Sequence, residues 1–204
     1  MTSPVLQGIG LSCIRDDRVL FADLVFALQA GQALLLEGQN GSGKTSLLRI
    51  LCGFREADAG TILWCGTGIN DSQYRADMAY VGHLDGIKKE LTVLENLSFA
   101  VALGQSGLHA IADALARVQL SGYDDMPVQA LSAGQKRRLS LARLLVTQNR
   151  LWILDEPFTS LDKQGIKLTE TLMAEHCAGG GLIVLTSHHD LNLQGVAVQR
   201  IHLS

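Results

Sequence analysis

The segment at residues 38–45 constrains the fold more than any other part of this chain. It reads Gly-Gln-Asn-Gly-Ser-Gly-Lys-Thr, which matches the phosphate-binding loop pattern Gly-x4-Gly-Lys-Ser/Thr. An apolar run at 33–37 precedes it, and an apolar helical pattern at 46–51 follows it. A strand that turns through glycines into a helix is the building unit of α/β proteins. The segment therefore predicts an α/β fold with a parallel sheet.

Each residue type in this segment has a task in holding a triphosphate. Glycines let backbone N–H groups turn inward, and the start of the following helix adds its dipole. Lys44 supplies positive charge to the β and γ phosphates, and the Thr45 hydroxyl is placed to ligate Mg²⁺. A glycine-rich turn with no ligand would not need this Lys-Thr pair. We therefore predict a site for ATP and Mg²⁺ whose ATP contacts come from Gly38, Gln39, Asn40, Gly41, Ser42, Gly43, Lys44, Thr45 and Ser46.

The remaining apolar patterns separate into two kinds of strand. The runs at 33–37, 151–155 and 182–186 contain almost no polar residue, which is typical of parallel strands covered on both faces. Other segments alternate between apolar and polar residues, which suits a partly antiparallel edge sheet. The alternating segments are 5–14, 20–28 and 61–64.

Between residues 86 and 120 the pattern changes to helical periodicity. Thr92 and Glu95 form a Thr-x-x-Glu capping box at the start of one helix. Loops are predicted at 104–107 and 121–127, and a helix from about 136 to 146. We expect one domain over 1–204. Its predicted parts are an α/β core with a β subdomain at 1–82 and 148–204, and a helical subdomain at about 83–147.

Composition excludes several classes of protein. Hydrophobic residues make up 47% and charged residues 18% of the 204 residues, so intrinsic disorder is excluded as the main state. The net charge is −3 and the only dense basic run is at 136–138, so we expect no nucleic-acid partner. No apolar run approaches the roughly 18 residues of a membrane span, and no secretory signal opens the chain. These features favour the cytoplasm.

The four cysteines are scattered along the chain and form no Cys-x-x-Cys pair. We predict that they are small buried hydrophobic residues rather than metal ligands or disulfide partners. They are Cys13, Cys52, Cys65 and Cys177.

Two carboxylates end the apolar strand at 151–155. Asp155 at such a strand end, beside a phosphate-binding loop, holds Mg²⁺, and the adjacent Glu156 can reach a water in line with the γ-phosphate. An Asp-Glu pair that only solvates a strand end is the alternative, and the phosphate-binding loop makes it the weaker one. Glu156 therefore predicts hydrolysis rather than nucleotide binding alone.

The segment Leu-Ser-Ala-Gly-Gln at 131–135, upstream of the Asp-Glu strand, resembles the signature of ATP-binding cassette (ABC) ATPases. The resemblance covers nearly the whole chain, and the motifs follow the family's order. It implies a P-loop NTPase of the ABC type, with a RecA-like core, an antiparallel β subdomain and a helical subdomain. It also implies a homodimer in which Ser132, Gly134 and Gln135 of one subunit meet the γ-phosphate held by the other.

The family's remaining motifs have counterparts near the carboxyl end of the sequence. Ser-Leu-Asp at 160–162 resembles the D-loop, which implies that Asp162 couples the two sites of a dimer. The family's switch histidine follows the next strand, where the sequence offers two candidates. We favour His188 because the strand before it ends at residue 186 or 187, and His189 remains the competing assignment. In this family the histidine contacts the γ-phosphate and acts with Lys44 and Glu156 in catalysis.

Two departures from the family pattern stand out. His83 occupies the position where the family usually has glutamine, and it is a further candidate contact for the Mg²⁺ site. Because an imidazole titrates near neutrality and an amide does not, we hypothesise that turnover is unusually sensitive to pH between about 6 and 7. No aromatic residue stands where the family stacks adenine, and Arg15 is the candidate to stack through its guanidinium plane.

Within the family, the chain most resembles the ATP-binding subunits of the haem exporter, or cytochrome c maturation, complex. The resemblance rests on Tyr-Val-Gly-His at 80–83, Glu-Leu-Thr-x-x-Glu-Asn-Leu at 90–97 and the short length. It implies an integral membrane permease as partner, haem-handling maturation factors, and attachment at the cytoplasmic face of the inner membrane. Two alternatives stay open, namely the ATPase of an unrelated small transporter and a soluble, non-transport cassette.

Overall fold

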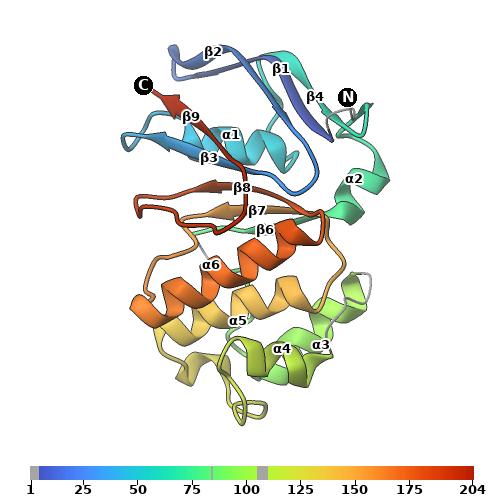
Figure 1. Ribbon diagram of the computed structural model, residues 1–204, viewed down its shortest axis with the longest axis vertical. Coiled ribbons are helices and arrows are strands. Elements are labelled where there is room, and N and C mark those ends of the chain that lie inside the picture. The colour runs from blue at the N-terminus through green and yellow to red at the C-terminus, as the bar shows by residue number, and fades with distance from the viewer. Residues whose placement is uncertain (1–4, 84, 105–109) are drawn as a thin grey trace.

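The computed structural model describes residues 5–83, 85–104 and 110–204, and its strands form two sheets (Figure 1). The first sheet is antiparallel and has the strand order β2-β1-β4-β5. The second is parallel and has the order β6-β7-β8-β3-β9. The antiparallel strands are β1 (Leu6–Arg15), β2 (Arg18–Leu28), β4 (Ala59–Trp64) and β5 (Thr67–Gly68). The parallel strands are β3 (Ala33–Gly38), β6 (Met78–Val81), β7 (Leu151–Asp155), β8 (Leu182–Thr186) and β9 (Val198–Leu203).

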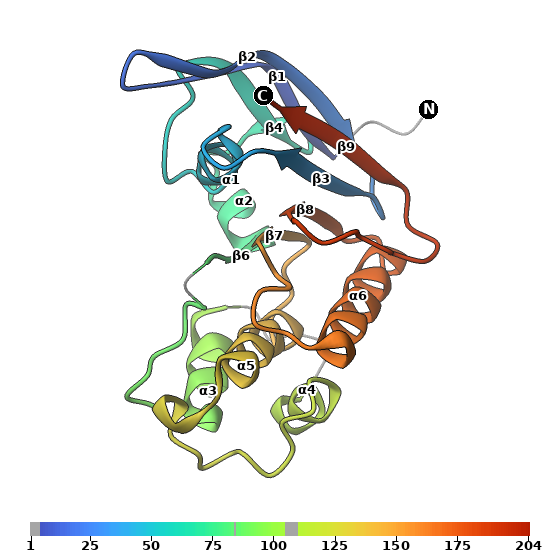
Figure 2. The same ribbon diagram turned by 90° about the vertical axis from the view of Figure 1, so that its left-hand side faces the viewer.

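The helices fill and cover these sheets in layers (Figures 1 and 2). α1 lies between the antiparallel sheet and the parallel sheet, whereas α5 and α6 cover the opposite face of the parallel sheet, with α3 and α4 beyond them. None of the described helices is long and apolar enough to cross a bilayer. The helices are α1 (Lys44–Leu51), α2 (Ser72–Asp77), α3 (Val93–Leu103), α4 (Ile111–Arg117), α5 (Ala133–Leu145) and α6 (Lys163–Ala178), with a 3₁₀ turn at Val128–Ala130.

Side-chain alternation along the parallel strands explains why both faces of this sheet are covered. In β7, Leu151 and Ile153 join the apolar cluster around α1, while Trp152 and Leu154 join the cluster formed with α3 to α6. Strands β3 and β8 divide their residues in the same way. Successive side chains of a strand point to opposite faces, so an uninterrupted apolar run supplies two cores at once.

The strand predictions are confirmed. The apolar runs at 33–37, 151–155 and 182–186 are β3, β7 and β8, and the alternating segments fall in β1, β2 and β4. The helix predicted from 136 starts earlier, at Ala133, and the helix predicted from 46 starts at Lys44. The short strand β5 and the edge strand β9 were not predicted.

The helical periodicity between 86 and 120 corresponds to α3 and α4. The predicted capping box is confirmed, because Thr92 Oγ1 accepts from the Glu95 N–H at 3.2 Å and the Thr92 N–H donates to Glu95 Oε2 at 2.8 Å. The predicted loop at 104–107 lies largely outside the described residues. Helices α3, α4 and α5 fall within 83–147, and the subdomain limits themselves stay a prediction.

One of the four cysteine predictions is wrong. Cys13, Cys52 and Cys177 are buried, but Cys65 is exposed. Cys65 lies in the tight turn between β4 and β5 with a φ of 50°, so its side chain projects from the turn rather than into the core. The sequence pattern of scattered cysteines carries no information about turns of this kind.

Candidate functional site

A pocket of about 400 Å³ opens beside the carboxyl ends of β3 and β7 and the start of α1. Most of the residues predicted to carry chemistry line this pocket together, although they come from segments far apart in the chain. Gly38, Gln39 and Ser42 belong to the same loop but do not line it. The lining residues are Arg15, Leu20, Asn40, Gly41, Gly43, Lys44, Thr45, Ser46, His83, Asp155, Glu156 and His188.

The phosphate-binding loop joins β3 to α1. Gly41 and Gly43 have φ values of 85° and 103°, in the left-handed region that glycine tolerates best. Lys44 is buried, and its Nζ donates to the carbonyl oxygens of Gly38 at 2.6 Å and Gln39 at 3.0 Å. An ammonium group has three donors, so these two bonds hold the charge over the loop and leave capacity for an anionic ligand.

Asp155 ends β7 with its carboxylate held by two threonine hydroxyls. Thr186 Oγ1 donates to Asp155 Oδ1 at 2.7 Å, and Thr45 Oγ1 lies 3.4 Å from Asp155 Oδ2. Oxygen donors of this kind suit Mg²⁺, which usually takes one or two protein ligands and completes its shell with phosphate oxygens and water. The chemistry of Thr45 and Asp155 therefore fits the predicted metal.

Thr186 is a site residue that the sequence analysis missed. It is completely buried at the end of β8, directly opposite Asp155 in the parallel pairing. Its hydroxyl also accepts from the Glu156 N–H at 2.9 Å. A single threonine at the end of an apolar strand gives no distinctive sequence signal, and only the strand register shows what it contacts.

Glu156 and His188 both line the pocket and contact each other. The His188 N–H donates to Glu156 Oε2 at 3.2 Å, and His188 Nε2 lies 3.6 Å from Glu156 Oε1. His189 does not line the pocket, and its ring packs against Phe158 with ring centroids 5.3 Å apart. Of the two histidines, the geometry thus favours His188. Glu156 itself has a φ of 50°, an uncommon conformation for a residue with a side chain.

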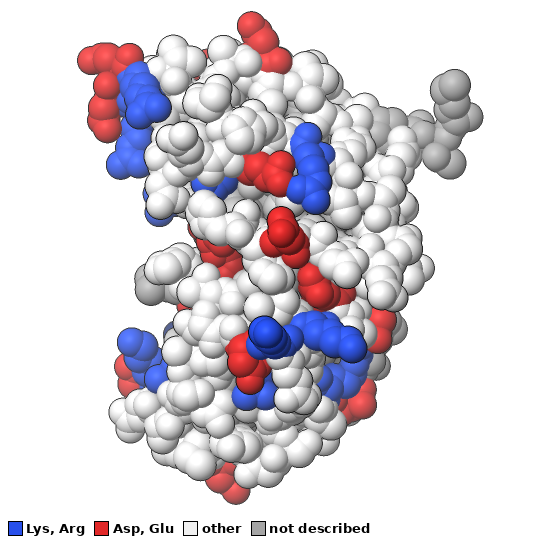
Figure 3. Space-filling model, turned by 60° about the vertical axis from the view of Figure 1, so that its left-hand side comes forward, with Lys and Arg blue, Asp and Glu red and all other residues white. Residues whose placement is uncertain are grey.

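Arg137 is the second residue that the sequence analysis missed, since it was counted only as part of a basic run. Its side chain is buried and donates to backbone carbonyls of two separate segments, at Gly82 with 2.9 Å and at Glu156 with 2.6 Å. It therefore faces the interior and is not part of a surface for phosphate backbones. On the face drawn in Figure 3, Lys and Arg side chains are interspersed with Asp and Glu.

The two departures from the family pattern both lie at this pocket. His83 is exposed and follows the end of β6. Arg15, at the end of β1, is 64% exposed in its side chain and pairs with Asp16 at 3.5 Å. Arg15 thus lies at the rim of the pocket with its side chain largely exposed.

The signature residues Ser132, Gly134 and Gln135 do not line the pocket of their own chain. Ser132 caps α5, because its Oγ accepts from the Gln135 N–H at 3.2 Å and its N–H donates to Gln135 Oε1 at 2.8 Å. Asp162 likewise caps α6, with its Oδ1 accepting from the Gly165 N–H at 2.7 Å. Within one chain these residues stabilise helix starts and do not meet the phosphate-binding loop.

Known proteins resemble this chain over nearly its whole length. The profile of the ABC transporter family matches residues 21–159. The cytochrome c biogenesis ATP-binding export protein CcmA of Vibrio cholerae is 45% identical over 98% of both chains. CcmA of Methylococcus capsulatus is 49% identical over 96% of both.

Solved structures show the same fold. A putative ABC transporter ATP-binding protein from Pyrococcus furiosus superposes with a TM-score of 0.84 at 22% identity, covering 97% of this chain and 96% of that one. An ATP-binding subunit of an ABC transporter superposes with a TM-score of 0.81 at 27% identity, covering 90% and 79%. The chain therefore belongs to the ABC transporter family of ATPases and, within that family, to the CcmA cytochrome c biogenesis ATP-binding export proteins.

Proposed function

We propose that this chain is the energy-coupling subunit of an ABC transporter that serves the assembly of c-type cytochromes, through haem export or the release of haem from its chaperone. As an ABC ATPase it binds and hydrolyses ATP. The observation that carries the proposal is the convergence of Lys44, Asp155, Glu156 and His188 on one pocket in a chain that matches CcmA proteins almost end to end.

The proposed division of work in the pocket follows the chemistry of each group. The N–H groups of residues 39–46 and the Lys44 ammonium bind the triphosphate. Thr45 and Asp155 hold Mg²⁺, with His83 as a further candidate contact, and the bound ion neutralises charge on the β and γ phosphates. Glu156 orients the attacking water and accepts its proton, while His188 contacts the γ-phosphate and keeps the Glu156 carboxylate in place.

The complete site needs a second copy of this chain. Ser132, Gly134 and Gln135 lie at the start of α5, where backbone N–H groups and the helix dipole favour an anion. Because they do not line the pocket of their own chain, we assign them to the γ-phosphate bound by the partner copy. Asp162, at the start of α6, then couples the two sites. ATP closes the dimer, and hydrolysis lets it reopen.

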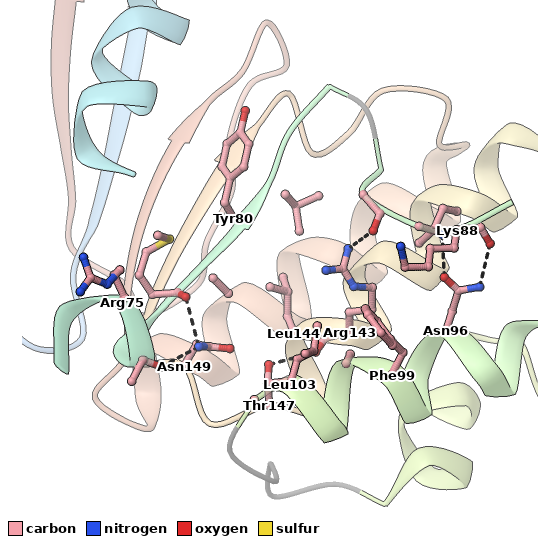
Figure 4. A pocket seen from close by; sticks show the side chains of 18 residues that line it. Arg75, Tyr80, Lys88, Asn96, Phe99, Leu103, Arg143, Leu144, Thr147 and Asn149 are labelled. Carbon is pink, nitrogen blue, oxygen red and sulfur yellow. Dashed lines mark hydrogen bonds between the residues drawn. The ribbon is translucent and has the colours of Figure 1, made fainter. Parts of the chain in front are cut away.

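A groove between the parallel sheet and α3 is the proposed docking surface for the membrane permease (Figure 4). It encloses about 720 Å³, and its apolar part includes Phe99, which is 44% exposed, and Leu103, which is 74% exposed. Three cations, Arg75, Lys88 and Arg143, line it, and no Asp or Glu does among the described residues. This charge fits a permease helix that presents apolar side chains together with a carboxylate or its carbonyl end.

The proposed location is the cytoplasmic face of the inner membrane, where the chain is held by its permease. Attachment through a groove fits the finding that no described helix can cross a bilayer. Val81 and Gly86 line the groove, and His83 between them in sequence lines the nucleotide pocket. One short segment of the chain therefore connects the proposed permease site to the nucleotide site.

The test is a capture experiment with Glu156→Gln as a trap. This variant is expected to bind Mg-ATP, hydrolyse it poorly and persist as a closed dimer. Tagged protein is added to native membranes with Mg-ATP, and the co-purifying proteins and the haem absorption spectrum of the eluate are recorded. Wild-type protein without nucleotide is the control. A small polytopic membrane protein with haem-handling factors supports the proposal.

Other captures would contradict specific parts of it. A permease of a different transporter would overturn the cytochrome pathway, and recovery of no membrane partner would favour a soluble cassette.

The proposed docking groove is tested separately by Leu103→Glu. This substitution places a negative charge beside the apolar wall of the groove and is expected to reduce capture of the permease at least tenfold. Val25→Glu is the matched control, since Val25 is 67% exposed on β2, away from the groove.

A further inference from the structure

Arg137 is a charged side chain in an unusual place. It lies in the second turn of α5 and is only 3% exposed. A buried guanidinium is strongly disfavoured unless each of its N–H groups has a partner. Burial accordingly lowers the pKa of Arg137 below the usual range of arginine, and the nearby Asp85 carboxylate partly offsets this by raising it. A fold that buries this guanidinium must therefore supply a hydrogen-bond acceptor for each of its N–H groups.

The hydrogen bonds of Arg137 account for all five of its N–H donors. Nη2 donates to the carbonyl oxygens of Asp155 at 2.8 Å and Glu156 at 2.6 Å, and Nε donates to that of Pro157 at 3.1 Å. Nη1 donates to the Gly82 carbonyl at 2.9 Å and to Asp85 Oδ1 at 3.2 Å. Four of the five acceptors are backbone carbonyls, so Arg137 fixes main-chain positions rather than neutralising a charge cluster.

These bonds join three segments that all take part in the site. One is the turn at 155–157, which carries Glu156. The second is the segment at 82–85, which carries His83 and begins the connection to α3. The third is α5 itself, whose first residues are the signature assigned to the partner's nucleotide. No other described side chain is hydrogen-bonded to both the 82–85 segment and the turn at 155–157.

The turn at 155–157 needs such support, because Glu156 has a φ of 50°. Non-glycine residues in this conformation persist where their surroundings hold them there. Here Arg137 binds the Glu156 carbonyl while the Thr186 hydroxyl binds the Glu156 N–H, so both sides of the residue are fixed. The direction in which the Glu156 carboxylate points follows from this backbone geometry.

We propose that Arg137 is a positioning residue for ATP hydrolysis, which aims Glu156 by locking its turn to α5 and to the segment that carries His83. The proposal rests on the proposed role of Glu156 as the group that activates water. A movement of α5 or of the 82–85 segment therefore shifts the Glu156 turn, because the planar Arg137 guanidinium links them through its five hydrogen bonds. Lysine cannot reproduce this fork, since its ammonium has three donors and no fixed plane.

The chain supplies a matched control at the next position. Arg138 is on the same helix and carries the same charge, but it is only partly buried and donates to Gln119 Oε1 at 3.1 Å. Arg137→Lys and Arg138→Lys therefore make the same chemical change in two surroundings. Asp85→Asn is a milder third variant, because it removes the one carboxylate hydrogen-bonded to Arg137 among the described residues and leaves the four carbonyl bonds in place.

The experiment measures ATP turnover and nucleotide binding of each variant, with kcat expressed per nucleotide-binding site. Arg137→Lys is expected to lower kcat by about 10- to 100-fold, the scale for a misplaced catalytic group, and to change KM and the Kd for Mg-ATP by less than about threefold. Arg138→Lys is expected to stay within twofold of wild type. In a Glu156→Gln background, Arg137→Lys is expected to cause little further loss, because it acts through Glu156.

Each contrary result has a defined meaning. A kcat for Arg137→Lys equal to that of Arg138→Lys would overturn the proposal, as would a higher KM at unchanged kcat or a full additional loss in the Glu156→Gln background. If Arg137→Lys does not fold, Asp85→Asn decides, with a severalfold fall in kcat expected and an unchanged kcat contradicting it. Full turnover in Glu156→Gln alone would instead reject the proposed role of Glu156.

Discussion

Polar side chains are buried at both ends of strand β7, but their hydrogen bonding differs between the two ends. At the carboxyl end, Asp155 accepts from Thr186, and the backbone that follows accepts from Arg137. At the amino end, Trp152 stacks on His176 with ring centroids 3.8 Å apart. There Trp152 Nε1 and His176 Nε2 are buried and have no hydrogen-bond partner in the described part of the chain.

This difference suggests that one end of β7 serves ATP hydrolysis and the other end serves the stability of the fold. A buried polar atom without a partner costs free energy, and a ring held by stacking gains mainly from apolar contact. Burial lowers the pKa of His176 to about 4, so this ring is held neutral. Substitutions at the carboxyl end of β7 are therefore expected to change turnover, and substitutions at the amino end to change the free energy of unfolding.

The largest effect is expected from Asp155→Asn. Asparagine keeps the shape and an oxygen that accepts from Thr186, but it removes the negative charge proposed to hold Mg²⁺. Turnover at saturating ATP is expected to fall by about 100-fold or more, as for other preorganised charges in active sites. The apparent Mg²⁺ affinity, measured by titrating the ATPase reaction, is expected to weaken. An unchanged Mg²⁺ titration would remove Asp155 from the metal site.

The next effect lies at the other end of the strand and depends on pH. As pH falls from about 6.5 to 4, His176 gains a proton in the unfolded chain but not in the folded one. Folding is thus favoured fully above about pH 6.5 and loses about 3 kcal/mol of stability by pH 4, at about 1.4 kcal/mol per pKa unit.

His176→Phe keeps the stacked ring and removes the titration, so this part of the pH dependence is expected to disappear. Urea unfolding at pH 7.5 and pH 4.5 measures it, with His202→Gln as the control because His202 is exposed on β9. Turnover at pH 7.5 is expected to stay within about twofold of wild type. If wild type and His176→Phe lose the same stability between the two pH values, the buried histidine is not the cause.

A smaller effect is expected from Thr186→Val, which removes a hydroxyl and keeps the shape. Asp155 and the Glu156 N–H each lose a hydrogen bond, so kcat is expected to fall about tenfold and the free energy of unfolding by about 1–3 kcal/mol. Thr186→Ser restores the hydroxyl and is expected to recover most of the kcat. A serine variant as slow as the valine variant would show that the methyl group, not the hydroxyl, matters.

The smallest effect is expected from His83→Gln. Glutamine can offer an amide oxygen from the same exposed position, so kcat at pH 7.5 is expected to change by less than about threefold. The hypothesis that His83 makes turnover unusually sensitive to pH between about 6 and 7 is tested on the same variant. Since glutamine has no ionisable group in this range, superimposable pH profiles for the two proteins would reject it.

The local parts of the fold could be predicted from the sequence. The phosphate-binding loop is contiguous, and β3, β7 and β8 are apolar runs whose burial follows from their composition. The pocket residues Lys44, Thr45, Asp155 and Glu156 belong to such contiguous motifs, so their proximity follows once the strands are parallel.

The non-local parts could not be predicted. Arg137 reads as one member of a basic run until its acceptor Gly82, 55 positions away, is placed beside it. The role of Thr186 becomes visible only from the strand register, which places it opposite Asp155. Strand β9 mixes apolar and polar residues without a regular period. It pairs with β3, more than 160 positions earlier, a partner that the local sequence does not identify.

The position of β3 has a consequence for how the protein is made. Among the strands that the structure describes, this early strand, which leads into the phosphate-binding loop, pairs with β8 and β9, which follow it by more than 140 positions. Gly38 lies so close to β9 that an added Cβ would clash with the Leu203 carbonyl oxygen. During synthesis on the ribosome, β3 therefore lacks these two neighbours until residues 182–203 have emerged, so the sheet that carries the phosphate-binding loop is completed only then.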